Sequence, residues 1–409
     1  MEFERNLDKY AELAVKAGVN IQKDQFLWIS APTGSEQLVR RIVRQAYLAG
    51  AGDVHVQWYD EEVKRTHYEL APDSAFEHFP KWLAAAFDSV GEREGAFLQV
   101  EADDPDLLKG IPPERLQTYE KARGNALESF YDAIETDRIS WSIIAMPSQK
   151  WADKVFPELP ECERISALWN TIFEAVRVNE EKPVDEWRKH IETLQVKASQ
   201  LNEKRFWKLQ YTAPETDLTV ELPDKHLWLT GSSTNKAGTT FIANMPTEEV
   251  YTVPLKTGVN GYVSSTKPLA YQGNIIDNFK LTFEQGKIIK AEAETGQDLL
   301  NKILETDEGA KYLGEVALVP HKSPISDTGI LFFNTLFDEN ASNHLAIGSS
   351  YPTCFEGSQA LSEKEKKSAG LNDSIVHEDF MIGSNEMDIH GINKDGTREA
   401  VFRKGNWAF

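Results

Sequence analysis

A strand, a helix and a second strand follow one another near the start of the chain, and this order restricts the fold more than any other feature of the sequence. The short runs 26–30 and 54–58 have the composition of strands. The segment between them carries apolar residues at helical spacing and ends at Gly50 and Gly52. Such a unit predicts two parallel strands joined by a right-handed crossover.

Further along the chain, this pattern first repeats and then gives way to another. Residues 96–100 and 141–145 are predicted strands with helices between them, which extends the open sheet. From Phe206 onward, short β-rich runs and tight turns dominate. The predicted strands are residues 218–222, 226–229, 280–283 and 288–291, and the predicted hairpin turns are 284–287 and 393–396. We therefore expect an α/β domain with a mostly parallel open sheet at residues 1–205, and a β-rich α+β domain at residues 206–409.

The composition narrows the class of protein. Asp and Glu number 65 against 44 Lys and Arg, a formal net charge of −21, so the surface should repel nucleic acid and anionic membranes. No apolar run approaches the roughly 20 residues that span a bilayer, and the charged start of the chain lacks the apolar core of a secretory signal. Cys162 and Cys354 are too few for a disulfide framework or a four-thiolate zinc site. These features favour a cytoplasmic protein.

Carboxylates and histidines gather at several places in the C-terminal half. Glu248 and Glu249 follow a Pro-Thr turn, and because adjacent side chains diverge, one of them is expected to point inward. The alternative is an exposed acidic turn. His344 enters an apolar stretch shortly after Asp338 and Glu339, where the alternative is a hydrogen-bonded core histidine.

Two further places have the same character. If residues 375–383 form a strand, His377 and Asp379 project from one face as a compact pair of nitrogen and oxygen ligands. The alternative is a polar strand face near solvent. Glu315 lies at the mouth of the apolar run 313–319. Burial of this carboxylate alone would be costly, so it needs a metal ion, a proton, or an Arg or Lys partner.

Together these places supply oxygen and nitrogen donors but no sulfur, which suits Zn, Mn or Co rather than a structural zinc site. The set exceeds what one catalytic metal needs, and two divalent ions ~3.5–4 Å apart would use it. The candidate ligands are Glu249, Glu315, His344, Tyr351, His377 and Asp379.

Two segments of the second half are distinctive. They are residues 243–254, Ala-Asn-Met-Pro-Thr-Glu-Glu-Val-Tyr-Thr-Val-Pro, and residues 258–269, which end in Ser-Thr-Lys-Pro-Leu. Both resemble peptidase family M29, the thermophilic-type metalloaminopeptidases. Residues 18–22 and the strand at 27–29 are also typical. The resemblance covers essentially the whole length. It implies the same ligand set in the same chain order, with Glu249 rather than Glu248 as the first ligand.

The resemblance also implies a function. It suggests an aminopeptidase that removes N-terminal residues of many kinds from short peptides with a free N-terminus. It further implies an α/β N-terminal domain, a β-rich catalytic domain, and a homodimer whose active sites face an internal cavity.

The ligand set suggests a mechanism in which two ions share a carboxylate and a bridging water, whose pKa they lower to give hydroxide near neutral pH. Tyr351 would bind a metal or the developing oxyanion. Glu315 and Glu339 are both candidates for the general base, and the sequence does not choose between them. The segment 258–267 is expected to line the substrate cleft, or else to be a hairpin connection.

Two other classes of function stay open. One is a different dinuclear metallohydrolase, such as a phosphoesterase, although the acidic surface disfavours an anionic substrate. The other is a non-enzymatic metal- or ligand-binding protein, in which the cluster that includes Asp379 is purely structural.

Overall fold

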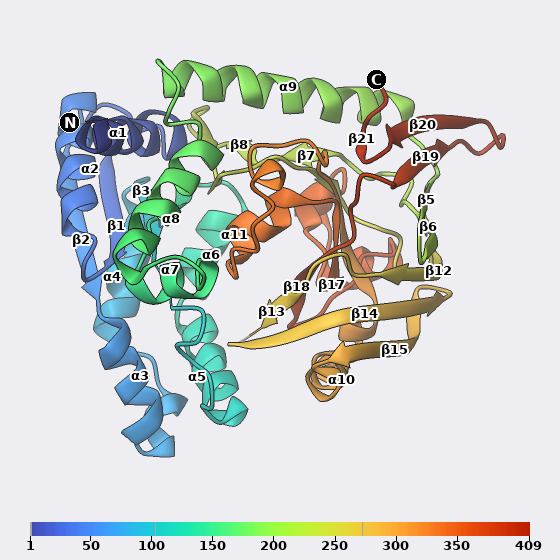
Figure 1. Cartoon of the computed structure of the whole chain (residues 1–409), viewed down its shortest axis with the longest axis horizontal. Helices are drawn as coiled ribbons and strands as arrows, with labels where there is room; N and C mark the ends of the chain where they lie inside the picture. The colour runs from blue at the N-terminus through green and yellow to red at the C-terminus, as the bar shows by residue number, and fades with distance from the viewer. Residues whose placement is uncertain (1, 103, 272) are drawn as a thin grey trace. The chain divides into compact units, whose positions relative to one another are not determined.

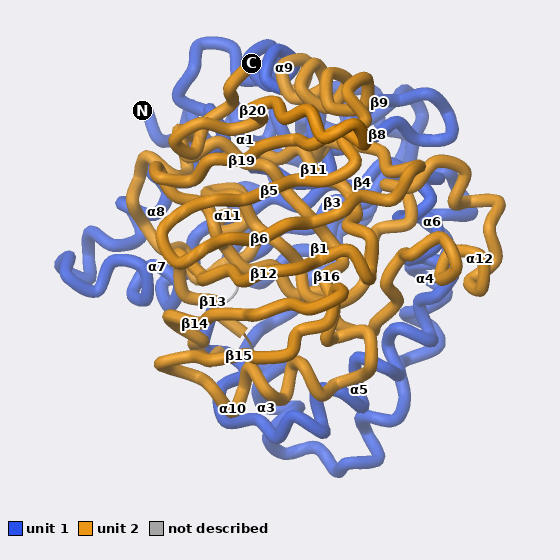
Figure 2. The backbone as a smooth tube through the Cα atoms, turned by 90° about the vertical axis from the view of Figure 1, so that its right-hand side faces the viewer, with its two compact units in different colours: residues 1–190, 232–246 blue, residues 191–231, 247–409 orange. Residues whose placement is uncertain are grey.

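The computed structural model describes residues 2–102, 104–271 and 273–409 (Figure 1). The chain forms two compact units, which Figure 2 distinguishes by colour. The first unit consists of residues 1–190 and 232–246, and the second of residues 191–231 and 247–409. These bounds differ from the predicted domains at residues 1–205 and 206–409, which stay a prediction.

A parallel sheet is the centre of the first unit, and its neighbouring strands are ordered β10-β4-β3-β1-β2. The strands are β1 (Phe26–Pro32), β2 (Asp53–Tyr59), β3 (Ala96–Glu101), β4 (Ser140–Ala145) and β10 (Asn244–Met245). Every pairing is parallel, which confirms the open α/β sheet predicted from the sequence. The short strand β10 adds an edge strand that the sequence pattern did not reveal.

The first unit also contains a series of helices. They are α1 (Glu2–Leu13), α2 (Glu36–Ala49), α3 (Glu61–Leu70), α4 (Lys81–Glu92), α5 (Pro113–Ala126), α6 (Glu128–Glu135), α7 (Gln149–Val155) and α8 (Glu161–Ala175). Helix α9 (Pro183–Lys204) begins in the first unit and continues in the second. Helix α1 continues as a π-helix over Ala14–Gly18. On one sheet face, Phe26, Trp28 and Phe97 pack with Val90 of α4 and Phe130 of α6.

A long antiparallel sheet forms one layer of the second unit, in the order β13-β14-β12-β6-β5-β19-β20-β21 with β15 against β14. Its strands are β5 (Lys208–Ala213), β6 (Thr216–Glu221), β12 (Val259–Ser264), β13 (Leu269–Tyr271), β14 (Asn274–Glu284), β15 (Lys287–Thr295), β19 (Asp388–Ile392), β20 (Arg398–Arg403) and β21 (Asn406–Trp407). The predicted hairpins at 284–287 and 393–396 join β14 to β15 and β19 to β20. Within the segment 258–267, Val259–Ser264 form strand β12, and residues 265–267 follow it as a loop.

A short antiparallel sheet forms a second layer of this unit, in the order β18-β17-β16-β11-β7. Its strands are β7 (Leu229–Thr230), β11 (Val250–Thr252), β16 (Leu313–Leu318), β17 (His344–Gly348) and β18 (His377–Met381). The helices of the unit include α10 (Gln297–Leu304), α11 (Thr335–Asp338) and α12 (Glu363–Ser368), and a 3₁₀ turn over Glu339–Ala341 follows α11. The β-rich second half is therefore confirmed.

One predicted strand is mostly wrong. Of residues 226–229, only Leu229 belongs to a regular strand. The backbone N–H of His226 donates to Pro223 O at 3.0 Å and closes a turn, and His226 forms only an isolated bridge with Phe355. The apolar run of this segment reflects burial rather than sheet pairing.

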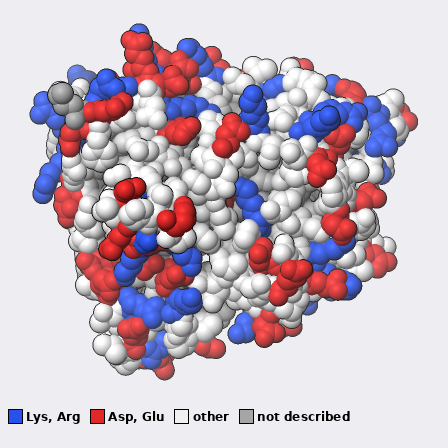
Figure 3. Space-filling model, viewed as in Figure 1, with Lys and Arg blue, Asp and Glu red and all other residues white. Residues whose placement is uncertain are grey.

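On the face drawn in Figure 3, acidic and basic side chains are interspersed. Among the described residues, no helix is both long enough and apolar enough to cross a bilayer.

Candidate metal centre

The register of the short antiparallel sheet brings the predicted ligands to one face. Residues directly opposite one another in antiparallel strands share a face. Glu315 pairs with Ala346, which pairs in turn with Asp379. His344 of the same central strand lies opposite Met381, and Gly348 lies opposite His377. Three neighbouring strands therefore contribute two carboxylates and two imidazoles to one face.

The central strand leaves room between these side chains. Ala346 is the only side chain between Glu315 and Asp379 across β17, and Gly348 has none. Gly348 also has a positive φ of 106°, and a Cβ atom built on it would lie 2.0 Å from Val376 O. Glycine is therefore required here both for the backbone conformation and for the close approach of the chain beside His377.

Glu249 joins the same face from the neighbouring strand. Tyr251 of β11 pairs with Ala317, and Glu249 lies two residues earlier, so strand alternation places both on the side of Glu315. Glu248 and Glu249 are only 3% and 7% exposed, so the alternative of an exposed acidic turn is wrong. The backbone N–H of Glu248 donates to Asn340 Oδ1 at 2.8 Å, which fixes the segment.

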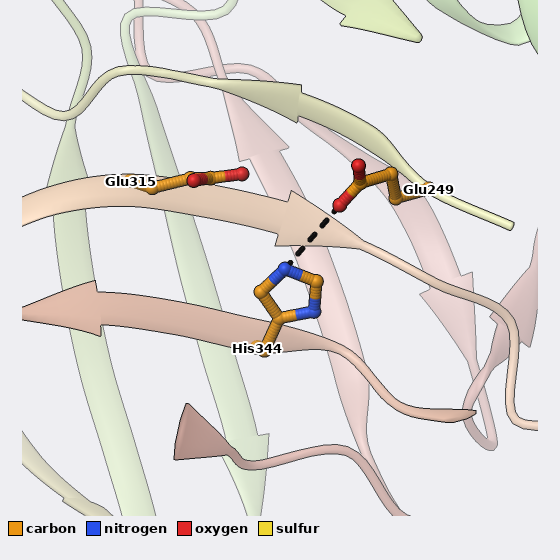
Figure 4. A group of neighbouring side chains, drawn as sticks. All are labelled: Glu249, Glu315 and His344. Atoms are coloured by element: carbon orange, nitrogen blue, oxygen red, sulfur yellow. Dashed lines mark ion pairs between the residues drawn. The ribbon is translucent and has the colours of Figure 1, made fainter. Parts of the chain in front are cut away.

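Two groups of possible ligand atoms result, and Glu315 belongs to both. In each group, the ligand atoms lie within 4.8 Å of one another. The first group is Glu249, Glu315 and His344 (Figure 4), in which His344 Nε2 lies 3.4 Å from Glu249 Oε2. The second is Glu315, His377 and Asp379, in which His377 Nε2 lies 3.2 Å from Glu315 and 3.7 Å from Asp379.

Hydrogen bonds to backbone carbonyls set the tautomer of both histidines. His344 Nδ1 lies 3.1 Å from Ser342 O, and His377 Nδ1 lies 2.8 Å from Ser349 O. A carbonyl oxygen can only accept, so Nδ1 carries the proton and Nε2 of the neutral ring presents a lone pair. In both cases that lone pair is directed at a carboxylate, and two acceptors that face each other need a cation or a proton between them.

Two further observations indicate that these residues are suited to bind a divalent metal ion. His377 Nε2 and Asp379 Oδ1 are buried without a hydrogen-bond partner of acceptable geometry among the described residues. No Lys or Arg forms an ion pair with Glu315 in the described part of the chain; its charged neighbour is His377. Oxygen and nitrogen donors without sulfur suit Zn, Mn or Co.

Burial and the charges of neighbouring groups shift the pKa values of the cluster residues. Burial raises the pKa of Glu315 to about 7, although the neighbouring His377 acts to lower that pKa. Burial lowers the pKa of His377, but the negative charges of Asp379 and Glu315 outweigh it and raise that pKa to about 10. The pKa of His344 is also raised, because Glu249 and its neighbours outweigh burial. Without a metal, the cluster holds protons in the places that a cation would take.

Tyr351 lies beside the second group. Its ring centroid is 4.6 Å from that of His377 and 6.0 Å from that of Tyr251, which packs edge-on against it. Although 44% of the residue is exposed, burial of the hydroxyl end and the neighbouring charges of Glu315 and Asp379 raise its pKa. The phenol is therefore protonated at neutral pH and available as a donor.

Glu339 lies beside the cluster without belonging to either group. It is buried, and burial together with the charges of Asp379 and Glu249 raises its pKa. Asn340 Nδ2 donates to its Oε1 at 3.3 Å. A buried carboxyl group with a raised pKa next to a cation site has the properties of a general base or acid.

The structure adds participants that sequence reasoning missed. Tyr251 could have been found, because it alternates with Glu249 on one strand face. The carbonyls of Ser342 and Ser349 could not have been found, because any residue supplies a carbonyl and only the fold directs it at a histidine. The ligand role of each cluster residue stays a prediction.

Comparisons with known proteins agree with this picture. The chain matches the family described as thermophilic metalloprotease (M29) over residues 3–407. It is 52% identical over 407 residues to aminopeptidase AmpS of Bacillus subtilis strain 168, covering 100% of this chain and 99% of the relative. It is 48% identical over 407 residues to aminopeptidase 2 of Geobacillus stearothermophilus, covering 100% of this chain and 98% of that relative. The solved structure of wild-type AmpT from Thermus thermophilus is similar with a TM-score of 0.93 at 40% identity, covering 100% of both chains.

Proposed function

This chain belongs to the M29 family of thermophilic metalloproteases, and we propose that it is an aminopeptidase that uses two divalent metal ions on the face of the short antiparallel sheet. The family resemblance inferred from the sequence is thereby confirmed, and so is the assignment of the chain to the metalloaminopeptidases. The observation that supports two ions rather than one is the pair of ligand groups that share Glu315.

The two groups define which residues would hold which ion. Glu249, Glu315 and His344 would hold one ion, and Glu315, His377 and Asp379 the other. Glu315 would be the shared carboxylate, as expected for two ions ~3.5–4 Å apart. Zn, Co and Mn are the candidate metals, because the ligands mix imidazole and carboxylate. Such ions supply Lewis acidity toward the scissile carbonyl and an activated water near neutral pH.

The protein's own groups complete the chemistry. Because Glu315 would be occupied as a shared ligand, we assign the general base to Glu339, the buried carboxyl group outside both groups. It would take the proton of the attacking water and later pass it to the leaving amine. Tyr351, with a protonated hydroxyl, would donate to the oxyanion that develops on the carbonyl.

The metal site itself favours a free N-terminus on the substrate. Two divalent ions would balance the charge of the ligand carboxylates Glu249, Glu315 and Asp379. The nitrogen of a free α-amine offers a lone pair that one ion could accept, whereas an acylated N-terminus does not. This supports short peptides with a free N-terminus as substrates.

Location and assembly belong to the same proposal. Both cysteines are free, Cys162 exposed and Cys354 buried, which suits a reducing compartment and hence the cytoplasm. A homodimer with an internal cavity follows from the family resemblance alone, and sedimentation of the purified protein tests it.

Hydrolysis of three chromogenic substrates tests the function. Leucyl p-nitroanilide should be hydrolysed, N-acetyl-leucyl p-nitroanilide should not, and p-nitrophenyl phosphate should not. A chelator should remove the activity, and Zn²⁺, Co²⁺ or Mn²⁺ should restore it. Phosphatase activity without anilide hydrolysis would support a phosphoesterase instead. A folded protein inactive on every substrate and with every metal would support a binding protein.

A further inference from the structure

Asn340 lies in the 3₁₀ turn that follows α11, directly after Glu339, and it is 0% exposed. Its side-chain amide forms hydrogen bonds to three different segments. Oδ1 accepts from the backbone N–H of Glu248 at 2.8 Å. Nδ2 donates to Leu336 O at 3.0 Å and to Glu339 Oε1 at 3.3 Å. One buried side chain therefore connects the segment before β11, helix α11 and the carboxyl group assigned as the base.

The partners of this amide determine its orientation. A backbone N–H can only donate and a backbone carbonyl can only accept. The oxygen of Asn340 must therefore face Glu248, and its nitrogen must face Leu336. The same nitrogen offers its second N–H to Glu339. A carboxyl group that accepts such a bond is held in place through one oxygen, which leaves the other oxygen for a proton.

Only one of these bonds has a purely structural purpose. Leu336 lies in α11, and the carbonyls at the end of a helix need partners from outside the helix. Asn340 supplies a partner for one of them. A residue that only capped the helix would need neither the bond to Glu248 nor the bond to Glu339.

The bond to Glu248 acts on the metal centre through the backbone. Glu249 is the next residue, and its carboxylate points toward His344 (Figure 4). Glu248 is 3% exposed, so water cannot readily replace the partner of its N–H. The backbone that carries Glu249 is therefore fixed by the same amide that holds Glu339.

We propose that Asn340 is a positioning residue, which holds the base Glu339 and the ligand segment at Glu249 in a fixed relation to each other. This inference rests on the proposed function and on the assignment of Glu339 as the base. A base must lie within hydrogen-bond reach of the proton that it takes. A misplacement of about 1 Å can cost roughly 100-fold in rate, so a direct link between the two segments has a catalytic purpose.

Two substitutions separate the contacts of Asn340, with leucyl p-nitroanilide turnover measured at saturating Co²⁺. Asn340→Asp keeps an oxygen for the N–H of Glu248 but has no N–H for Glu339. Its kcat should fall at least about 10-fold, the lower end of the range for a hydrogen bond to a charged group, with KM and metal content unchanged. Asn340→Ala lacks both contacts and should also bind Co²⁺ roughly 10-fold more weakly.

A double-mutant cycle with Glu339→Gln shows whether Asn340 acts through the base. In the Glu339→Gln background, Asn340→Ala should change kcat by less than about 3-fold at saturating metal, because the side chain that it holds no longer takes a proton. An equal loss of kcat in both backgrounds would overturn the proposal, since a residue that only supports the fold affects turnover whether or not the base is present.

Asn235→Ala is the matched control, because Asn235 is a buried amide of the first unit with a similar set of bonds. It is 6% exposed, and its Oδ1 accepts from the backbone N–H groups of Ala237 and Thr239 at 3.0 and 2.9 Å. Its Nδ2 donates to Ser140 Oγ at 3.0 Å. Asn235→Ala should lower the Tm but leave kcat and metal affinity unchanged. A loss of kcat equal to that of Asn340→Ala would contradict a specific role for Asn340.

The outcomes distinguish this inference from the function on which it rests. Wild-type turnover in metal-loaded Asn340→Asp and Asn340→Ala would overturn the role of Asn340 and leave the aminopeptidase intact. Full turnover in Glu339→Gln would also overturn it, because the base would lie elsewhere. A metal-loaded wild type that does not hydrolyse leucyl p-nitroanilide would overturn both. Thermal unfolding identifies a variant that does not fold, and if Asn340→Ala is one, Asn340→Asp, which has nearly the same size as the wild type, decides in single-mutant and double-mutant form.

Discussion

His377 directs its Nε2 atom at the carboxylate of Glu315 across 3.2 Å, without a hydrogen bond of acceptable geometry. The other ring nitrogen of His377 is committed to a backbone carbonyl. The gap between the two side chains therefore contains a proton in the metal-free protein and is suited to a metal ion in the active one. Competition between proton and metal has measurable consequences.

Metal affinity should fall as the pH falls. The pKa of His377 is raised to about 10 in the metal-free protein, so across the neutral range a proton must leave before a metal binds. Each displaced proton should make the apparent affinity roughly 100-fold weaker at pH 6 than at pH 8. Calorimetric titration with Zn²⁺ in buffers of different ionisation enthalpy measures both the affinity and the protons released. An affinity independent of pH, with no proton release, would refute the assignment of His377 as a ligand.

Removing one cluster carboxylate should destabilise the metal-free protein. Asp379→Asn removes the negative charge that faces protonated His377 and should lower the free energy of unfolding by about 1–3 kcal/mol in chelator. It should also abolish the further stabilisation that metal gives the wild type. Thermal unfolding with and without metal measures both effects.

Asp388→Asn is the control for this substitution. Asp388 accepts from Arg403 and from the backbone N–H of Lys404, so the amide should lower stability in both conditions and leave the metal effect intact. A metal-free Asp379→Asn protein more stable than the wild type would contradict the proposed electrostatics.

The small side chain of Ala346 should be essential for metal binding. Ala346 lies between Glu315 and Asp379 across β17, and leucine would extend into the space between the two carboxylates. Ala346→Leu should lower metal affinity at least about 10-fold and cost about 1–3 kcal/mol of stability from overpacking. Equilibrium dialysis and circular dichroism measure the two effects. Undiminished metal binding by a folded variant would place the ions elsewhere.

The two candidate bases should respond differently to conversion to glutamine. Glu339→Gln should retain metal and lose about 100- to 10,000-fold in kcat, because the base is gone. Glu315→Gln should lose metal as well as activity, because the shared ligand is gone. Metal analysis alongside anilide kinetics distinguishes the two. Full turnover in Glu339→Gln would return the role of base to Glu315.

The sequence predicts the elements well where a periodic pattern extends over several residues. Strand β1 and helix α2 have such patterns, and both form where expected. In the same way, His377 and Asp379 lie two apart in a strand, which predicts a shared face from local geometry alone. These predictions need no knowledge of the partner strands.

Relationships between distant strands could not be predicted. The alignment of Glu315, Ala346 and Asp379 in one row depends on the register of three strands separated along the chain, and each register is set by packing of the whole sheet. Strand β10 is too short to have a period, and the residues around His226 are apolar because they are buried, not because they pair.

Titration of the metal-stripped protein with Co²⁺ tests the central claim most directly, with leucyl p-nitroanilide hydrolysis followed at each addition. Two ligand groups that share Glu315 predict that activity reaches its plateau at two equivalents of metal per chain. A plateau at one equivalent, or full activity in protein shown by elemental analysis to be free of metal, would contradict the dinuclear aminopeptidase.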